Sequence, residues 1–150
     1  MSLVLQFELL FHLGLAAILS GLIGMDRERK HQTAGLRTHI LVGVGSCLFT
    51  MLSIYSFGDG DPGRVASQIL PGLGFLGAGA ILKEGRTIQG LTTAASMWTT
   101  AAVGMAIGTG AWFIAICATL TIWFILVVIQ RMKPDNLKDS PDERDERDSE

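Results

Sequence analysis

The sequence predicts an all-α fold, an integral membrane bundle of five transmembrane helices. Two observations support this prediction: charged residues are absent from four long runs, and a segment such as "AWFIAICATLTIWFILVVI" has no polar face. The charge-free runs cover residues 9–25, 38–58, 65–82 and 87–130. Because a helix that crosses about 30 Å of hydrocarbon needs roughly 20 mainly apolar residues, the first three runs fit one crossing each and the fourth fits two.

The glycines of "GTGA", residues 108–111, predict a turn that divides the fourth run, since glycine supplies the backbone freedom of a tight turn. The expected spans are residues 5–25, 38–57, 65–82, 90–107 and 111–130. A soluble bundle would need polar helix faces, whereas lipid allows a helix that is apolar all round. Residues 1–130 therefore form the predicted transmembrane domain, and the polar residues 131–150 form a charged tail that is expected to be disordered.

The basic residues predict the orientation of the helices. With five crossings, only Arg64 among the 12 Lys and Arg residues falls on the face opposite to the others. Cytoplasmic loops carry the excess of Lys and Arg, so we expect the amino terminus outside and the carboxyl terminus in the cytoplasm. No basic residue precedes Arg27, and a cleaved signal peptide would carry positive charge before its apolar stretch. The first helix is therefore expected to remain in the mature protein.

The third span contains glycines with the spacing of a dinucleotide-binding turn, Gly72, Gly74 and Gly77. That fingerprint requires a strand before it and an acidic residue about 20 positions later, and no charged residue lies between positions 87 and 130. These glycines and Gly79 are instead interpreted as helix-packing positions, because small residues let membrane helices approach closely. They occupy two sides of the helix, which predicts that it lies between two neighbours at the centre of the bundle.

Hydroxyl side chains form a stripe on the fourth predicted helix, at Thr92, Ser96 and Thr99. Such a stripe could line a hydrated path or bind a partner helix. The favoured interpretation is that the hydroxyls bond carbonyls of their own helix and pack tightly. On the first helix, Glu8 and His12 lie one turn apart, and an interfacial pair is preferred to a proton relay.

Charged residues are dense between the first two spans, where Asp26 begins a charged run and Arg37 precedes the second helix. A charge at the bilayer centre costs at least about 2.5 to 3.5 kcal/mol, so these groups are expected at the membrane boundary, paired where partly buried. An ion pair between Asp26 and Arg37 is predicted; the alternative is a basic anchor with no further role. In the loop at the other face, Asp59 and Asp61 could attract a hard cation, although a solvated turn is favoured.

Three stretches carry a family resemblance in their order and spacing: "GLIGMDRERKHQTAGLRTHILVGVGSCL", "RVASQILPGLGFLGAGAILKEG" and "GLTTAASMWTTAAVGMAIGTG". The chain resembles the membrane domain of the MgtC/SapB family of bacterial inner-membrane proteins over residues 21–110. Asp26 stands where Glu is usual, and Thr92 and Thr99 stand where the best-studied type of member has Asn and Cys. The resemblance points to the four packing glycines and to Asp26, Arg27, Ala34, Gly35, Leu36, Arg37, Thr38, Gln68, Glu84, Gly85, Gly90 and Leu91.

The resemblance implies a multi-pass protein of the bacterial inner membrane, linked to magnesium homeostasis and virulence, without enzymatic chemistry. Two functions stay open. One is a regulator that docks on a membrane partner, such as the proton-driven ATP synthase, through small-residue helix faces. The other is a transporter or channel for Mg²⁺ or another cation, with Asp26 and the hydroxyl stripe along its route.

The expected partners are the lipid bilayer, further copies of the chain and a membrane protein, with no nucleic acid. No cofactor is expected, and the residues assign no site to Mg²⁺. Longer members of the family carry a soluble carboxyl-terminal domain that resembles an ACT fold. This chain ends in a charged tail, so regulation through such a domain is not expected.

Overall fold

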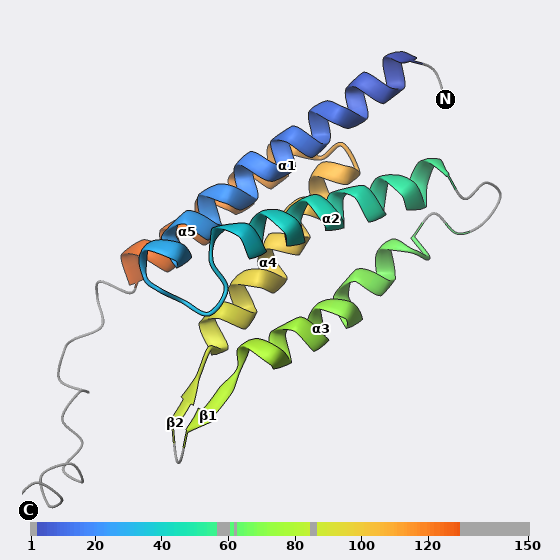
Figure 1. Ribbon diagram of the computed structural model, residues 1–150. Helices are drawn as coiled ribbons and strands as arrows, with labels where there is room; N and C mark the ends of the chain where they lie inside the picture. The colour runs from blue at the N-terminus through green and yellow to red at the C-terminus, as the bar shows by residue number, and fades with distance from the viewer. Residues whose placement is uncertain (1–2, 57–60, 62, 85–86, 130–150) are drawn as a thin grey trace, which may run out of the picture.

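The computed structural model describes residues 3–56, 61, 63–84 and 87–129, and the predicted tail at residues 131–150 lies outside this part. The described chain folds into five α-helices and one two-stranded hairpin (Figure 1). The elements in order are α1 Leu3–Arg29, α2 Leu36–Tyr55, the 3₁₀-helix η1 Ala66–Gln68, α3 Ile69–Ala80, β1 Leu82–Glu84, β2 Thr87–Gln89, α4 Leu91–Gly108, α5 Trp112–Phe124 and the π-helix η2 Ile125–Ile129.

The all-α fold with five helices is confirmed, and the helices follow the predicted spans. Two of them, α1 and α2, are long and apolar enough to cross a membrane, and the segment Trp112–Val128 is a shorter apolar helix. The turn between α4 and α5 falls at the predicted glycines, where Gly110 adopts a φ of +82°. Large apolar side chains cover the outside of the helices, among them Phe7, Phe11, Leu41, Phe49, Phe75, Trp98, Phe113 and Leu120.

A β-hairpin connects α3 to α4, between the predicted spans 65–82 and 90–107. Its two strands are antiparallel, with Lys83 opposite Ile88. Gly90 ends the hairpin with a φ of +86°, a left-handed conformation that a side chain would strain. A Cβ at Gly90 would also overlap the carbonyl oxygen of Ala80. The glycine thus lets the chain turn directly from the hairpin into α4 while touching the end of α3.

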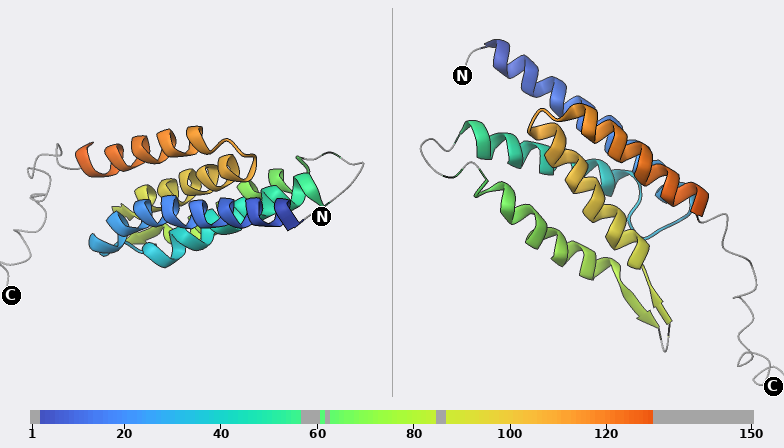
Figure 2. Two further views of the ribbon diagram at one scale, coloured as in Figure 1. Left: turned by 90° about the horizontal axis from the view of Figure 1, so that it is seen from above. Right: turned by 180° about the vertical axis from the view of Figure 1, so that it is seen from behind.

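α4 is the central helix of the bundle, because α1, α2, α3 and α5 all pack against it (Figure 2). The expectation that the third helix would hold this place is wrong for the single chain. α3 lies at the edge and packs mainly against α4. The physical reason is that the glycines at the tightest helix contact belong to α2 and α4.

The backbones of α2 and α4 touch at Gly43 and Gly104. A Cβ at Gly104 would overlap the carbonyl oxygen of Gly43, and a Cβ at Gly108 would lie 2.8 Å from the carbonyl oxygen of Cys47. Gly104 and Gly108 form a GxxxG pattern, which is typical of close helix contacts in membranes. This pattern is the signal by which the sequence could have identified α4 as the central helix.

Around this contact, α1, α2, α4 and α5 share one apolar core. It consists of Ala16, Leu19, Ile23, Cys47, Met51, Val103, Ile107, Ala115 and Leu126. These residues fix the four helices against one another, and α3 stands outside this core.

Substitution of Gly104 by Ala should destabilise the protein by about 1 to 3 kcal/mol, because the added methyl group forces the two backbones apart. Gly45→Ala is the matched control, since a Cβ at Gly45 meets nothing within 4 Å. It should be neutral or stabilising by up to about 1 kcal/mol, because glycine inside a helix costs conformational entropy. Thermal unfolding in detergent measures both, and equal effects of the two substitutions would contradict the described contact.

Candidate functional site at the hairpin end of the bundle

The helices alternate in direction, which gathers several chain segments at one end of the bundle. This hairpin end contains the end of α1, the start of α2, the β-hairpin and the start of α4 (Figures 1 and 2). Four basic residues of the described chain, Arg27, Arg29, Lys30 and Arg37, lie in the segment between α1 and α2 or beside it, whereas Arg64 precedes η1 at the opposite end. This end contains the polar cluster of the bundle, which consists of Asp26, Arg27, Glu28, Lys30, Gln32, His39, Thr93 and Ser96.

Asp26 holds two cations at the end of α1. Its Oδ2 lies 2.6 Å from Nη2 of Arg27, and its Oδ1 lies 2.8 Å from Nζ of Lys30. Arg27 is only 1% exposed. A buried charge is tolerated when a counter-charge and hydrogen bonds accompany it, so the Asp26 carboxylate is the group that allows this guanidinium to enter the bundle.

The predicted ion pair between Asp26 and Arg37 is wrong. Arg37 is exposed on the first turn of α2, and it has no ion pair with any described residue. The carboxylate is already satisfied within α1, because Arg27 is its direct neighbour and Lys30 lies one turn further along the helix. The short-range partners are reached with less loss of side-chain freedom than a residue on another helix.

Lys30 also fastens α1 to the end of the chain that the structure describes. Its Nζ donates a hydrogen bond of 2.9 Å to the carbonyl oxygen of Leu126. Leu126 lies in η2, the π-helical turn that continues α5. Short π-helical turns expose backbone acceptors differently from an α-helix and occur frequently at functional sites. One lysine thus links the carboxylate of Asp26 to α5.

The connection between α1 and α2 is a tight turn built on His31, which has a φ of +51°. The N–H of His31 donates to the carbonyl of Glu28 at 3.0 Å, and the N–H of Gln32 donates to the carbonyl of Arg27 at 3.1 Å. These two bonds form a Schellman motif, a common helix ending. The turn directs Gln32 toward α4, where its Oε1 accepts a hydrogen bond of 3.4 Å from Oγ1 of Thr93.

Gly35 leaves space for a side chain that caps α2. Oε2 of Glu28 accepts a hydrogen bond of 2.9 Å from the N–H of Leu36, the first residue of that helix. A Cβ at Gly35 would overlap the same Oε2 atom. The first N–H groups of a helix lack intrahelical partners, and a carboxylate stabilises them. Gly35 is therefore required by the approach of Glu28 from the preceding helix.

His39 connects α2 to α4 through Ser96. Its Nδ1 lies 2.9 Å from the carbonyl oxygen of Gly35, and its Nε2 lies 3.0 Å from Oγ of Ser96, which in turn lies 2.8 Å from the carbonyl oxygen of Thr93. A carbonyl can only accept, so Nδ1 carries a hydrogen. The single hydroxyl proton of Ser96 then serves either Nε2 of neutral His39 or the Thr93 carbonyl beside a protonated imidazole. Ser96 therefore responds to the protonation state of His39.

The predicted hydroxyl stripe divides among three environments. Ser96 is buried against α2, and Thr92 is exposed. Thr99 donates to carbonyl oxygens of its own helix, at 3.1 Å to Ala95 and 3.0 Å to Ser96. The buried stripe of α4 instead runs through Thr93, Ser96 and Thr100. For Thr99, bonding within the helix agrees with the interpretation that the sequence favoured.

Other residues singled out by the sequence lie elsewhere. Gln68 is exposed in η1, at the end opposite the hairpin. Glu84 ends β1, beyond the cluster around Asp26. The structure therefore brings Asp26, Arg27, Gly35 and Ser96 into one region and leaves Gln68 outside it. His39 and Glu28, which complete this region, were missed because a lone histidine and one acid in a charged run give no distinctive pattern.

Among the described residues, Gly77 is the one glycine of α3 at which an added Cβ would touch another helix. A Cβ at Gly77 would lie 3.5 Å from Cβ of Ala94 on α4, whereas a Cβ at Gly72, Gly74 or Gly79 would meet nothing within 4 Å. The small side chains of these three positions are therefore not needed for packing inside the chain. Their role in helix contacts stays a prediction, now directed at molecules outside it.

The described residues contain no group of three or more His, Cys, Asp and Glu side chains that could hold a metal ion. In the loop before η1, Oδ1 of Asp61 accepts a hydrogen bond of 2.8 Å from the N–H of Gly63, as expected for a polar turn. Asp59 lies outside the described residues.

Glu28→Ala and Gly35→Ala should each destabilise the protein by about 1 kcal/mol, the usual contribution of a helix cap. The double substitution should cost less than the sum, because Gly35→Ala has no carboxylate to displace once Glu28 is shortened. Chemical unfolding in detergent gives the free energies for this cycle. Strictly additive costs would show that Glu28 does not approach Gly35.

Ser96→Ala should destabilise the protein by about 1 to 3 kcal/mol, because it leaves Nε2 of buried His39 without its partner. Thr99→Ala removes a hydroxyl that only bonds its own helix, and it should cost less than about 0.5 kcal/mol. The same unfolding measurement compares them. Equal costs would contradict the assigned contact between α2 and α4.

Comparison with known proteins covers most of the chain. The profile described as "MgtC family" matches residues 13–134. The chain is 44% identical over 133 residues to "Putative magnesium transporter YhiD" of Escherichia coli (strain K12), which is 83% of this chain and 62% of that protein. It is 48% identical over 119 residues to "Protein MgtC" of Brucella abortus (strain 2308), 79% of this chain and 49% of that protein.

A third relative, "Protein MgtC" of Salmonella typhimurium (strain 14028s), is 42% identical over 119 residues, 79% of this chain and 51% of that protein. The chain therefore spans between 49% and 62% of the length of these relatives. No solved structure matches it. The matched residues include α2, α3, α4, α5 and all of the polar cluster at the hairpin end. On the extent of this match, the chain belongs to the MgtC family.

Proposed function

We propose that this protein is a regulator of magnesium or general ion homeostasis in the bacterial inner membrane, where it docks on another membrane protein through α3. In this proposal all five helices cross the membrane, with the amino terminus outside and the hairpin end in the cytoplasm. The length and apolar character of α1 and α2 support the membrane location. The basic residues at the hairpin end support the orientation, and the name of the relative from Escherichia coli supports the link to magnesium.

The single observation that carries the proposal is the one-sided packing of α3. Leu73, Gly77 and Ala80 are buried. Gly77 faces Ala94 of α4, and Ala80 belongs to a small core with Met97 of the same helix. On the opposite side of the helix, Pro71, Gly74, Phe75 and Ala78 are exposed and form the free face of α3. The side chain of Phe75 is 82% exposed.

A face of small residues with one projecting aromatic ring suits a close contact with a second helix. In lipid, helices associate through close packing rather than through a hydrophobic driving force. Gly74 has free space around it, so a partner backbone can approach there without any rearrangement of this chain. A multi-subunit complex such as the proton-driven ATP synthase offers helices of this kind, and further copies of the chain are a second source.

The hydroxyl groups of α4 also favour regulation over transport. A cation path would need polar groups that face a common space. Thr92, Ser96 and Thr99 instead occupy exposed, buried and half-buried positions, and Ser96 bonds His39 of the neighbouring helix. The arrangement is that of a packed helix contact.

Transport of Mg²⁺ or another cation is the second candidate, and one observation favours it. Nδ1 of His12 and Oγ of Ser20 are buried on α1 without a hydrogen-bond partner among the described residues. Buried polar groups without partners are rare, and inside a membrane they often mark an ion path. The expectation that Glu8 and His12 form a pair receives no support, because neither bonds the other in the described chain.

Docking through the free face is tested by crosslinking in native membranes. A photoreactive benzoylphenylalanine in place of Phe75 should capture one defined membrane protein, and addition of Gly74→Leu should abolish the product by filling the face. The same residue in place of Phe113, exposed on α5, is the control and should not capture that protein. Identical products from both positions, or a product insensitive to Gly74→Leu, would contradict docking through α3.

Transport is tested separately in liposomes that contain only this protein. The proposal expects no uptake of Mg²⁺ above that of empty vesicles, because no partner is present and the buried hydroxyls of α4, those of Thr93, Ser96 and Thr100, are engaged in hydrogen bonds. Ion-selective uptake that Ser20→Ala or His12→Ala reduces would establish the second candidate and refute a purely regulatory role.

A further inference from the structure

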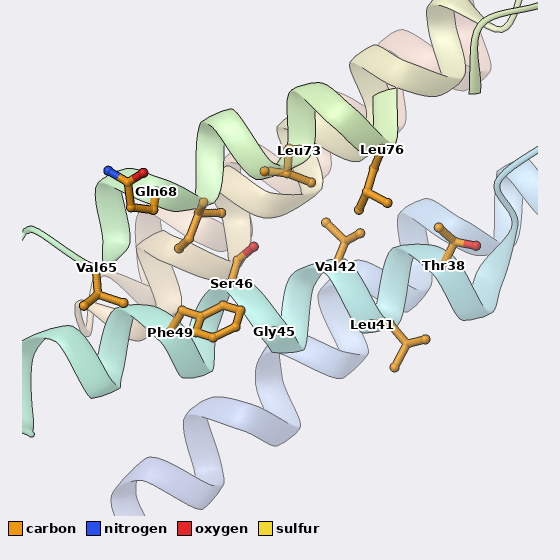
Figure 3. Close-up of a pocket in the computed structure, with 12 residues that line it drawn as sticks. Thr38, Leu41, Val42, Gly45, Ser46, Phe49, Val65, Gln68, Leu73 and Leu76 are labelled. Carbon is orange, nitrogen blue, oxygen red and sulfur yellow. The ribbon is translucent and has the colours of Figure 1, made fainter. Parts of the chain in front are cut away.

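An apolar groove separates α2 from α3 along most of their length. It encloses about 590 Å³ and is lined mainly by apolar residues. Val42, Gly45 and Phe49 form one wall, and Ile69, Gly72 and Leu76 form the other. Figure 3 shows Val42 and Leu76 approaching from the two helices, with Val65 and Gln68 at one end and Thr38 at the other. Both α2 and α3 pack against α4, and the groove lies between them.

Hydrogen bonds join α2 to η1 at one end of the groove. At the end opposite the hairpin, Oγ of Ser53 on α2 accepts hydrogen bonds from the N–H groups of Val65 and Ala66, at 3.2 and 3.3 Å. These bonds fasten the start of η1 to α2. The other end lies beside Thr38, in the first turn of α2, and no hydrogen bond joins α2 to α3 among the described residues there. We therefore take the hairpin end as the entrance for a ligand.

The length of the groove matches one membrane leaflet. Its wall on α2 runs from Thr38 to Phe49, which corresponds to about 16 Å at 1.5 Å per residue. Half of a hydrocarbon core of about 30 Å is roughly 15 Å. The groove is thus as long as one acyl chain in the leaflet at the hairpin end.

The lining of the groove suits an acyl chain. The groove has about 590 Å³ of space, and apolar side chains form most of its surface. An acyl chain is one carbon wide and bends, so it can fill the space without moving α2 or α3.

Arg37 provides the charge for a headgroup at the entrance. It directly precedes Thr38, is exposed, and has no carboxylate partner among the described residues. The two carboxylates nearest along the chain are already engaged: Asp26 pairs with Arg27 and Lys30, and Glu28 accepts from the N–H of Leu36. A basic residue at the cytoplasmic side of a groove between membrane helices is a typical site for an anionic lipid.

From the shape of the groove and the charge at its mouth, we propose that it binds one acyl chain of an anionic phospholipid, whose phosphate contacts Arg37. The site is separate from the free face of α3 and does not depend on whether the protein regulates or transports. It gives a role to Arg37, which the structure leaves outside the Asp26 cluster, and to Gly45 and Gly72, whose missing side chains keep the groove open.

Spin-labelled lipids test this site with the purified full chain in phosphatidylcholine vesicles. The fraction of motionally restricted label should show a preference for phosphatidylglycerol over phosphatidylcholine of about fivefold, the factor that one basic residue near an anionic headgroup contributes. Arg37→Gln should bring this preference close to one. Arg29→Gln is the control: Arg29 is also exposed at the hairpin end but belongs to α1, whereas Arg37 directly precedes Thr38 at the end of the groove.

Filling the groove should remove the bound lipid itself. Gly72→Leu and, from the other wall, Gly45→Leu should each lower the restricted phosphatidylglycerol signal, and neither position has an atom within 4 Å of its Cβ that would clash. Gly74→Leu on the free face of the same helix should leave the signal unchanged. Two groove variants guard against a folding defect in one of them, and thermal unfolding verifies both.

Two results would overturn the proposal. One is a restricted signal that Gly72→Leu and Gly45→Leu leave at the level of the unmodified chain. The other is a groove variant that keeps its lipid preference but no longer forms a dimer that the unmodified chain forms on crosslinking. That result would assign the groove to a second copy of the chain. Neither result bears on partner capture through Phe75, so this site and the proposed function fail independently.

Discussion

The contact between the backbones of α2 and α4 at Gly43 and Gly104 sets the geometry of the whole bundle. A side chain at Gly104 would separate the two helices, because its Cβ would overlap the carbonyl oxygen of Gly43, whereas a Cβ at Gly43 would overlap Oγ of Ser20 on α1. The same contact brings the first turns of α2 and α4 together at the hairpin end, where His39 meets Ser96. A change in the distance between α2 and α4 would therefore alter the hydrogen bond between His39 and Ser96.

The acids of the polar cluster are bound by residues close to them in the sequence. Asp26 neutralises two neighbouring cations, and Glu28 caps the helix that follows. Both acids are thereby occupied, which leaves Arg37 as an exposed positive charge at the hairpin end. The end of the bundle that is rich in basic residues can thus attract an anionic lipid while keeping its buried arginine paired.

The fold class, the five helices and the turn at Gly110 could be predicted from the sequence. Long runs without charged residues indicate apolar helices, and glycine indicates where the chain can turn. The central position of α4 did not follow. α3 has more glycines than α4, so a count of small residues favours α3 as the central helix. Such a count does not distinguish glycines that pack against a helix of the same chain from glycines that could pack against another molecule. The pairing of Asp26 failed for a related reason: sequence spacing did not show that Arg27 turns inward beside it. Gly35 was identified by family resemblance alone, and its physical role required the position of Glu28.

The arrangement of α2, α3 and α4 is measured most directly by solid-state NMR of the glycine-labelled protein in lipid bilayers. Carbon–carbon correlation should show a cross-peak between the carbonyl of Gly43 and Cα of Gly104, since these groups are in contact. Gly74 should show no cross-peak to a glycine of another helix in the same chain. A missing peak for the first pair, together with peaks that join Gly72 or Gly74 to α2, would place α3 at the centre and contradict this account.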